Sequence, residues 1–215
     1  MMSVFDIYYQ RYDDWYEKPF GKSVFKLEAE CMRKVFNIKG KTLEIGVGSG
    51  RFARELNISF GLDPSRNLIK FAKDRGIRVV IGKAEDLPFK DGVFDGILIV
   101  VSICFFEDPL KALREAKRVL KEGGILALGM VLRESPWGRF YEEKGKMGNP
   151  FYSSARFYSF EDVKKNLKIA GFSIERVYTT LFEEPQDKEP IKNTQIKEGY
   201  YPQGGFHCIL AKHSP

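Results

Sequence analysis

The sequence contains few of the residues that form disulfides, bind metals or act as general bases. Its 215 residues include three cysteines, Cys31, Cys104 and Cys208, without C-x-x-C spacing, and two histidines, His207 and His213. An odd number of unclustered cysteines argues against a disulfide framework and a zinc site, so we expect all three to be small apolar core residues and expect no bound metal. The sequence also lacks a G-x-S-x-G motif and a Walker loop, which excludes the common hydrolase and nucleotidase sites.

Long apolar segments are missing as well. The longest apolar run, 97–106, has ten residues and contains Ser102, whereas a membrane-spanning helix needs about 20. The N-terminus carries Asp6, Arg11 and Asp13 and offers no uncharged region for a secretory signal. We therefore expect a cytoplasmic protein without a membrane span.

The charge is balanced along the chain. The 35 Lys and Arg residues exceed the 29 Asp and Glu residues by enough for a net charge of +6, but the two signs are interleaved and form no like-charge block. This pattern indicates a dispersed solvated surface, so we do not expect a nucleic-acid partner. With 43% hydrophobic and 30% charged residues, the composition is typical of a single globular domain.

Short β-type runs alternate with helix-type segments through most of the chain, which predicts an α/β fold with a parallel sheet between helices. Asp63-Pro64 and Asp108-Pro109 are each typical of a helix start, with a capping carboxylate before a proline. The last two predicted strands are joined without a crossover helix, so we expect them to pair antiparallel at the edge of the sheet. The predicted strands are 42–45, 59–62, 77–81, 94–101, 125–131, 172–179 and 206–212.

Two segments outside this repeat are expected to cover a site. Aromatic residues three and four apart from 5 to 16 predict an amphipathic helix that ends near Pro19, and a second helix is predicted over 23–37. The stretch 133–158 is rich in aromatics and longer than a normal connection, which is typical of a lid. We therefore expect one domain in four parts: a helical cap (1–40), a cofactor-binding core (41–132), an acceptor lid (133–160), and a C-terminal helix with edge strands (161–215).

A glycine-rich turn follows the first predicted strand, where residues 43–52 read L-E-I-G-V-G-S-G-R-F. Glycines there allow a ligand to approach the backbone closely. A dinucleotide-binding G-x-G-x-x-G turn needs glycine where this chain has Arg51, which disfavours a nicotinamide cofactor. The carboxylate of Glu44 would repel a pyrophosphate but favour a ligand with ammonium and sulfonium charges. The turn therefore points to S-adenosylmethionine (SAM).

Further positions are suited to the same nucleoside. Asp63 ends the second predicted strand, where it can accept hydrogen bonds from both ribose hydroxyls, cap a helix, or do both. The turn 82–89, G-K-A-E-D-L-P-F, combines small, acidic and apolar groups suited to an adenine ring. The end of the fourth strand would lie under the methionine part. The predicted cofactor-binding residues are Glu44, Gly46, Val47, Gly48, Gly50, Asp63, Pro64, Ala84, Glu85, Val100 and Val101.

With these motifs in this order, the sequence resembles the class I SAM-dependent methyltransferases, in particular the ubiquinone-biosynthesis-like group of small-molecule enzymes. The resemblance covers nearly the whole chain and includes Phe94-Asp95, Glu107-Asp108-Pro109 and the L-K-E-G-G of 120–124. It implies a Rossmann-like, seven-stranded, mostly parallel sheet with helices on both faces and an antiparallel last strand. It also implies Asp63 on the ribose and Ala84-Glu85 beside the adenine.

The sequence departs from this group at two places. Lys83 stands where an acid usually precedes Ala84, so the contact to the adenine amino group must shift to Glu85, Asp86 or the backbone. A histidine pair common after the fourth strand is replaced by Cys104 and Phe105, which removes one candidate base.

We expect transfer of the methyl group from SAM to a small-molecule acceptor by in-line displacement, with S-adenosylhomocysteine (SAH) as the product. The sulfonium arrives activated, so alignment and exclusion of water are the main tasks and a strong base is optional. His207 is a weak candidate for a base and is more typical of a structural residue. The weakly predicted acceptor-binding residues are Tyr12, Trp15, Trp137, Arg139 and Arg156.

Two other functions fit the same cofactor site. An extended basic cleft would favour an RNA or protein methyltransferase, and a blocked acceptor cavity would favour a non-catalytic module that binds SAM and regulates a partner. The aromatic lid is compatible with a monomer or a homodimer.

Overall fold

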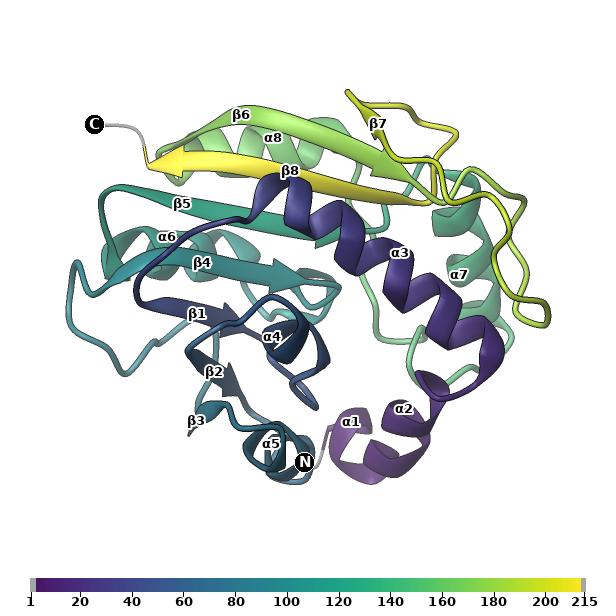
Figure 1. The fold of residues 1–215 in the computed structure, drawn as a ribbon, viewed down its shortest axis with the longest axis horizontal. Helices are drawn as coiled ribbons and strands as arrows, with labels where there is room; N and C mark the ends of the chain where they lie inside the picture. Colours follow the sequence, from purple (N-terminus) through teal and green to yellow (C-terminus); the bar gives the residue numbers. More distant parts are fainter. Residues whose placement is uncertain (1–2, 214–215) are drawn as a thin grey trace.

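The computed structural model describes residues 3–213, which contain one eight-stranded sheet in the order β3-β2-β1-β4-β5-β8-β6-β7 (Figure 1). Five strands run parallel, and β8 pairs antiparallel with both β5 and β6. This confirms the predicted fold class, with the two-residue β7 added at the edge beside β6. The strands are β1 (Thr42–Ile45), β2 (Phe60–Asp63), β3 (Arg78–Ile81), β4 (Phe94–Val100), β5 (Leu120–Met130), β6 (Phe172–Thr180), β7 (Lys197–Glu198) and β8 (Phe206–His213).

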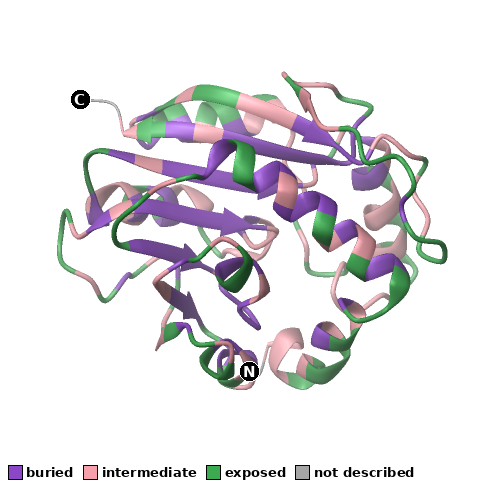
Figure 2. Cartoon of the chain, in the orientation of Figure 1, coloured by how far each residue is buried: buried purple, intermediate pink, exposed green. Residues whose placement is uncertain are grey.

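Helices cover both faces of the sheet because its central strands are buried on both sides. In β4, Ile97 and Ile99 belong to one core cluster and Leu98 and Val100 to the other, as the two-residue period of a strand requires. Helices α6 (Pro109–Val119) and α8 (Phe160–Ile169) pack on the first cluster, and α3 (Pro19–Val35) packs on the second, in front of the sheet in Figure 1. Figure 2 shows β1 and β4 buried along nearly their whole length.

Of the two predicted helix starts, the one at Asp108 is borne out and the one at Asp63 is wrong. Asp108 accepts a hydrogen bond from the Lys111 N–H at the start of α6, and Ser159 forms a capping box at the start of α8. Pro64 does not begin a helix, because α5 (Leu68–Asp74) starts four residues later and the carboxylate of Asp63 bonds elsewhere. The remaining helix of the core, α4 (Arg51–Glu55), follows the glycine-rich turn.

The N-terminal segment folds as α1 (Val4–Ile7), α2 (Tyr9–Trp15) and α3. The prediction that the first helix ends near Pro19 was wrong, because α2 ends at Trp15 and Pro19 begins α3. Proline is favoured at a first helical position since its missing N–H needs no partner there. Gly21 lies inside α3, where a Cβ would overlap the carbonyl oxygen of Trp15. This glycine therefore lets α2 and α3 meet closely.

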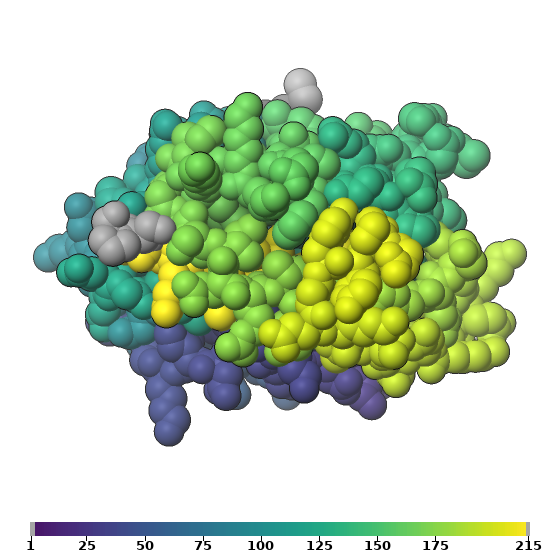
Figure 3. Space-filling view, turned by 90° about the horizontal axis from the view of Figure 1, so that it is seen from above, coloured from purple at the N-terminus to yellow at the C-terminus, as the bar shows by residue number. Residues whose placement is uncertain are grey.

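The segment expected to form a lid contains helix α7 (Pro136–Lys146), which the Ser135 side chain caps. The view from above in Figure 3 shows the later part of the chain, green to yellow, covering this side of the molecule, with the N-terminal part below it. Within residues 3–213, no helix combines the length and apolar character needed to cross a bilayer.

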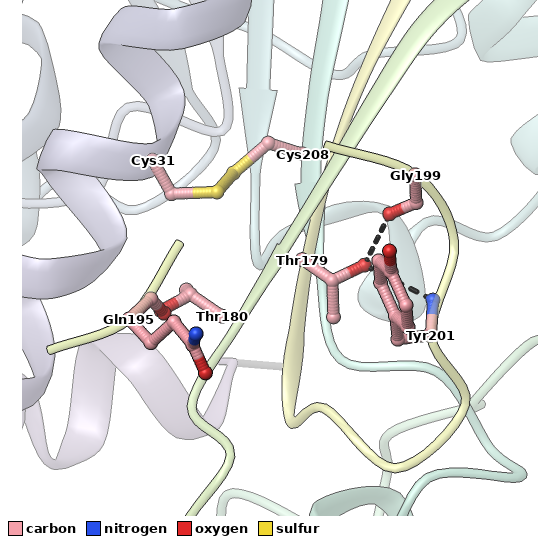
Figure 4. Close-up of a disulfide and its surroundings, with 7 residues drawn as sticks. All are labelled: Cys31, Thr179, Thr180, Gln195, Gly199, Tyr201 and Cys208. Carbon is pink, nitrogen blue, oxygen red and sulfur yellow. Dashed lines mark hydrogen bonds between the residues drawn. A yellow bond between two sulfur atoms is a disulfide. The ribbon is translucent and has the colours of Figure 1, made fainter. Parts of the chain in front are cut away.

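Cys31 of α3 and Cys208 of β8 form a disulfide (Figure 4), so the expectation that all three cysteines are unpaired was wrong for these two. Both residues are fully buried, and their Cα atoms lie 6.3 Å apart despite a sequence separation of 177. Cys104 remains a free thiol. The spacing carried no signal for this bond because only the packing of α3 on the sheet brings the two cysteines together.

We expect the bond to stabilise the protein by about 2–4 kcal/mol, because it constrains a long loop of the unfolded chain. Urea unfolding of the oxidised protein, the reduced protein and the double variant Cys31→Ala/Cys208→Ala would measure this. The variant Cys104→Ala, which lacks a different thiol, is the control. An unfolding midpoint that reductant does not shift would contradict the expectation.

Candidate active site

A cavity of about 490 Å³ lies at the carboxyl ends of the parallel strands, a size suited to a small ligand. Parallel α/β sheets bind ligands at this edge because the loops that leave the strands diverge there. The cavity is walled on one side by the loops after β1, β2, β3 and β4, and on the other by the N-terminal helices and the segment after β5. Residues on the first side are Gly46, Gly48, Leu62, Asp63, Pro64, Lys83, Ala84, Glu85, Val100, Val101 and Ser102.

The glycine-rich turn forms the floor of this side. Gly46 has a φ of +76°, and a Cβ there would overlap the side chain of Ser102, which donates a hydrogen bond to the Ile45 carbonyl oxygen at 3.1 Å. Only glycine fits both the backbone conformation and the contact. Gly46 and Gly48 line the cavity, whereas Gly50 and Val47 lie behind it and do not. Sequence reasoning missed Ser102 as the residue that supports the turn.

Asp63 joins the turn to the end of β2. Its Oδ2 accepts a hydrogen bond from the Gly48 N–H at 2.8 Å, and its Oδ1 accepts one from the Ser65 N–H at 2.8 Å. The residue is 8% exposed and lines the cavity. Burial raises the pKa of this carboxyl to about 6, against the two hydrogen bonds that lower it. Each carboxylate oxygen can accept a second hydrogen bond, so Asp63 retains acceptors for a ligand.

Glu44 lies behind the turn and does not line the cavity. It is 2% exposed, and its Oε2 has no hydrogen-bond partner among the described residues. Burial, followed by the nearby charge of Asp63, raises the pKa of Glu44 well above its usual range.

The turn after β3 supplies Ala84 and Glu85, the two residues expected beside an adenine, to the wall of the cavity. The Glu85 side chain accepts a hydrogen bond from the Asp108 N–H at 3.2 Å. Lys83, the residue that departs from the usual acid, forms an ion pair with Glu107 at 2.6 Å, and both line the cavity.

The opposite half of the cavity is aromatic. Tyr12 of α2 and Tyr16, which follows that helix, share a hydrogen bond of 3.1 Å between their hydroxyls, and the rings of Tyr141 and Tyr152 are stacked with centroids 4.5 Å apart. Glu28 of α3 also lines this half. The sequence contained a signal that Glu28 is buried, because a carboxylate four residues after Val24 falls on the apolar face of the helix. Other aromatic residues here are Phe5, Trp15, Phe20, Phe105, Phe106, Phe151, Phe157 and Tyr158.

The five predicted acceptor-binding residues separate into two groups. Tyr12 and Trp15 line the cavity, and the other three do not. Trp137 is fully buried, stacks on Phe20 and donates its indole N–H to the Glu183 carbonyl oxygen at 2.9 Å. The guanidinium groups of Arg139 and Arg156 donate to backbone carbonyl oxygens instead. Arg139 donates to Glu134, and Arg156 donates to Phe106 and Glu107.

His207 is fully buried in β8 and does not line the cavity. Its Nε2 lies 3.1 Å from the Tyr201 carbonyl oxygen, and burial lowers its pKa to about 4. A histidine in this position packs the sheet and has no access to a ligand in the cavity.

An ion-pair cluster attaches the N-terminal helices to the glycine-rich turn. Asp13 of α2 accepts two hydrogen bonds of 2.8 Å from Arg51 and one of 2.8 Å from Arg75, which also donates to the Ser49 carbonyl oxygen. Burial raises the pKa of Asp13, but the hydrogen bonds from both arginines outweigh it and lower the pKa to about 2. Arg51, which distinguishes the turn from a dinucleotide site, therefore holds the cap over the cavity.

Comparison with known proteins adds independent evidence. Residues 43–128 match a family described as a methyltransferase domain. A crystal structure from Thermotoga maritima, described as a SAM-dependent methyltransferase and possible histamine N-methyltransferase, is 38% identical with a TM-score of 0.88 and 98% of each chain covered. An uncharacterized protein of Methanocaldococcus jannaschii is 43% identical over 98% of this chain and 99% of its own. The ubiquinone/menaquinone biosynthesis C-methyltransferase of Rickettsia bellii is 31% identical over 65% of this chain and 59% of its own.

Proposed function

Because the chain belongs to the SAM-dependent methyltransferases, we propose that it methylates a small-molecule acceptor bound in the aromatic half of the cavity. The predicted class I family and enzyme class are confirmed by these relatives. The acceptor is our proposal, and one observation carries it: the glycine-rich turn and the tyrosines line the same cavity of about 490 Å³. A walled aromatic cavity suits a small molecule better than an extended polymer.

We place the cofactor along the loops after β1, β2, β3 and β4. Asp63 would accept hydrogen bonds from the ribose hydroxyls, and Ala84 and Glu85 would lie beside the adenine. Gly46 and Gly48 would hold the methionine part, with Val100, Val101 and Pro64 at its margins. When bound, SAM supplies a methyl group already activated on a sulfonium. Glu44, Val47 and Gly50 would support this arrangement from behind the turn.

The chain itself aligns the acceptor and excludes water, which are the main requirements for an in-line displacement. Tyr12 and Trp15 would contact the acceptor, because both line the cavity and α2 is held in place through Asp13. The names of two relatives, a ubiquinone/menaquinone biosynthesis C-methyltransferase and a possible histamine N-methyltransferase, refer to small-molecule chemistry and support this proposal.

Calorimetric titration with SAH and with NAD, followed by mass spectrometry of a metabolite panel incubated with methyl-labelled SAM, tests the proposal. We expect SAH to bind, NAD not to bind, and at least one small molecule to gain the label. Labelling of RNA or protein alone would identify a macromolecular methyltransferase. SAH binding without transfer to any acceptor would indicate a regulatory module.

The affinity for SAH should fall at acidic pH. Burial raises the pKa of Asp63 to about 6, and its ionised form is the better acceptor for two hydroxyls. Protonation therefore opposes binding, and we expect the Kd for SAH to rise by about tenfold per pH unit below pH 6. Calorimetry between pH 5 and pH 8 measures this dependence. The Asp63→Asn variant is the control, because its Kd for SAH should lack this dependence on pH. A Kd that does not change over this range would contradict the assignment.

A further inference from the structure

We propose that the methyl acceptor is a cationic amine, and that the carboxylate of Glu28 binds its ammonium group and takes the proton that the amine must lose before transfer. The inference rests on the proposed function and names the acceptor class for the same cavity.

Glu28 is a buried acid without a counter-charge. It is 6% exposed, lines the cavity, and forms no side-chain hydrogen bond or ion pair within residues 3–213. Asp63, the other buried acid that lines the cavity, accepts two backbone N–H groups, and Asp13 faces two arginines. Glu44 also has an unpartnered oxygen, but it does not line the cavity. A buried carboxylate without a partner is unfavourable, so a cavity that retains one is suited to a ligand that brings a positive charge. Burial raises the pKa of Glu28 to about 8, which is consistent with that missing partner.

Four tyrosines line the same cavity as this carboxylate. After burial, which is the largest cause, the charge of Glu28 contributes to raising the pKa of Tyr12, Tyr16, Tyr141 and Tyr152. The four side chains come from α2 (Tyr12), the residue that ends it (Tyr16), α7 (Tyr141) and the segment after α7 (Tyr152). Aromatic rings around one carboxylate favour a cation, through its attraction to the ring faces and to the acid.

Basic side chains on the cavity wall do not neutralise Glu28. Lys83 is paired with Glu107, and Lys144 is paired with Asp187. Arg11 lies over the ring of Phe151. Lys18, the fourth basic residue of the wall, is exposed and forms no ion pair with Glu28 among the described residues. The carboxyl group of Glu28 is therefore available to a ligand, and a bound cation would favour its ionised form.

Tyr12 connects this acid to the cofactor side. A Cβ on Gly48 would lie 3.7 Å from the Tyr12 ring, and the charges of Asp63 and Glu44 also contribute to raising its pKa. An acceptor held on Glu28 would thus lie one tyrosine away from the glycine-rich turn. Because Glu28 and Gly48 line one cavity, the acceptor nitrogen and the donor methyl group would share it.

The chemistry balances with one proton transfer. An ammonium nitrogen has no lone pair, so one proton passes from it to Glu28 and leaves a neutral amine and a neutral carboxyl. The nitrogen lone pair then forms the new N–C bond while the S–C bond breaks and its electron pair stays on sulfur. The products are a methylated ammonium and SAH, and Glu28 then releases its proton to water. His207 lies outside the cavity, and burial raises the pKa of the Cys104 thiol to about 12, so neither competes for this role.

The test uses 2-phenylethylamine, 2-phenylethanol, phenylacetate and benzyl mercaptan as probes of similar size and different chemistry. Binding of each to the SAH complex is measured by calorimetry, and methyl transfer from labelled SAM is measured by mass spectrometry. We expect the amine to bind at least tenfold more tightly than the alcohol and to be the only probe methylated. For Glu28→Gln we expect that preference to disappear and kcat/KM for the amine to fall about a hundredfold. SAH affinity should stay within twofold.

Glu30→Gln is the matched control, because Glu30 lies on the same helix and does not line the cavity. Glu28→Asp should restore part of the amine preference. Unchanged amine binding and transfer in Glu28→Gln would overturn the inference, as would a preference for the alcohol, thiol or carboxylate. Those last outcomes would leave the small-molecule function intact. No binding and no transfer of any probe, with labelling of RNA or protein, would overturn both proposals.

Discussion

The variant Asp63→Asn is expected to bind SAH on the order of a thousandfold more weakly than the wild-type protein. A hydrogen bond to a charged group contributes about 1.5–3 kcal/mol, and the proposed ribose contact contains two of them. Asparagine keeps the shape of the side chain but replaces one carboxylate oxygen with a donor. That donor would face either the ribose or the N–H groups of Gly48 and Ser65, which now bond to the acid.

Calorimetry at pH 7.5 measures the effect, because at that pH Asp63 of the wild-type protein is mostly ionised. Asp74→Asn is the control, since Asp74 is an exposed residue of the nearby helix α5. Circular dichroism before each titration would show that the variant is folded. A change in Kd of less than tenfold would contradict the placement of the ribose on Asp63.

Replacement of Asp13 by asparagine should destabilise the attachment of the N-terminal cap by about 3–5 kcal/mol, the range for removing one partner from a buried ion pair. The side chain of Asp13 is 10% exposed, and those of Arg51 and Arg75 are 13% and 18% exposed. Without the acid, two largely buried guanidinium groups lose their shared partner. The main remaining acidic contact is the ion pair of Arg51 with Glu17, whose side chain is 63% exposed.

Limited proteolysis measures cap release, and urea unfolding measures global stability. For Asp13→Asn we expect faster proteolytic cleavage within the segment N-terminal to Pro19, and we expect a lower midpoint of urea unfolding. Asp14→Asn is a close control, because this neighbouring acid is exposed. Among the described residues, its carboxylate accepts a hydrogen bond only from Gln10. Equal cleavage rates in both variants would contradict a role of Asp13 in holding the cap.

The lowered pKa of Asp13 also predicts how the stability of the protein changes at acidic pH. Its pKa is lowered to about 2 in the folded protein from an ordinary value of 3.8. The cluster therefore stabilises the fold above about pH 4, and this contribution is lost as the pH falls from about 4 through 2. The difference in stability between Asp13→Asn and the wild-type protein should shrink over that range.

The core of the fold and the cofactor side were predictable because both depend on local patterns. β1 has the predicted bounds and β2 and β4 are shifted by about one residue, since apolar runs between turn residues are read directly from the chain. Gly46, Gly48 and Asp63 lie together because the ends of parallel strands meet at one edge of a sheet. The fold class alone therefore brings these residues to one place.

The aromatic half of the cavity was predicted less well because aromatic residues have no local signature for the direction they face. Trp137 was expected in the site but is buried against Phe20, since its large apolar surface and its N–H both find partners in the interior. Glu28 was not predicted as a site residue, although its position on the apolar face of α3 is visible in the sequence. Only the packing of α2 and α7 against α3 makes that helix face part of a cavity wall.

By itself, the sequence determined the α/β fold, the glycine-rich turn and the carboxylate at the end of β2, because strand period, turn residues and helix caps act over a few neighbouring residues. Only the tertiary structure decided that Cys31 meets Cys208, that Arg51 holds Asp13, and that Glu28 lies unpaired among tyrosines. Each of these contacts joins distant parts of the chain, and its free energy depends on burial that exists only once the chain has folded.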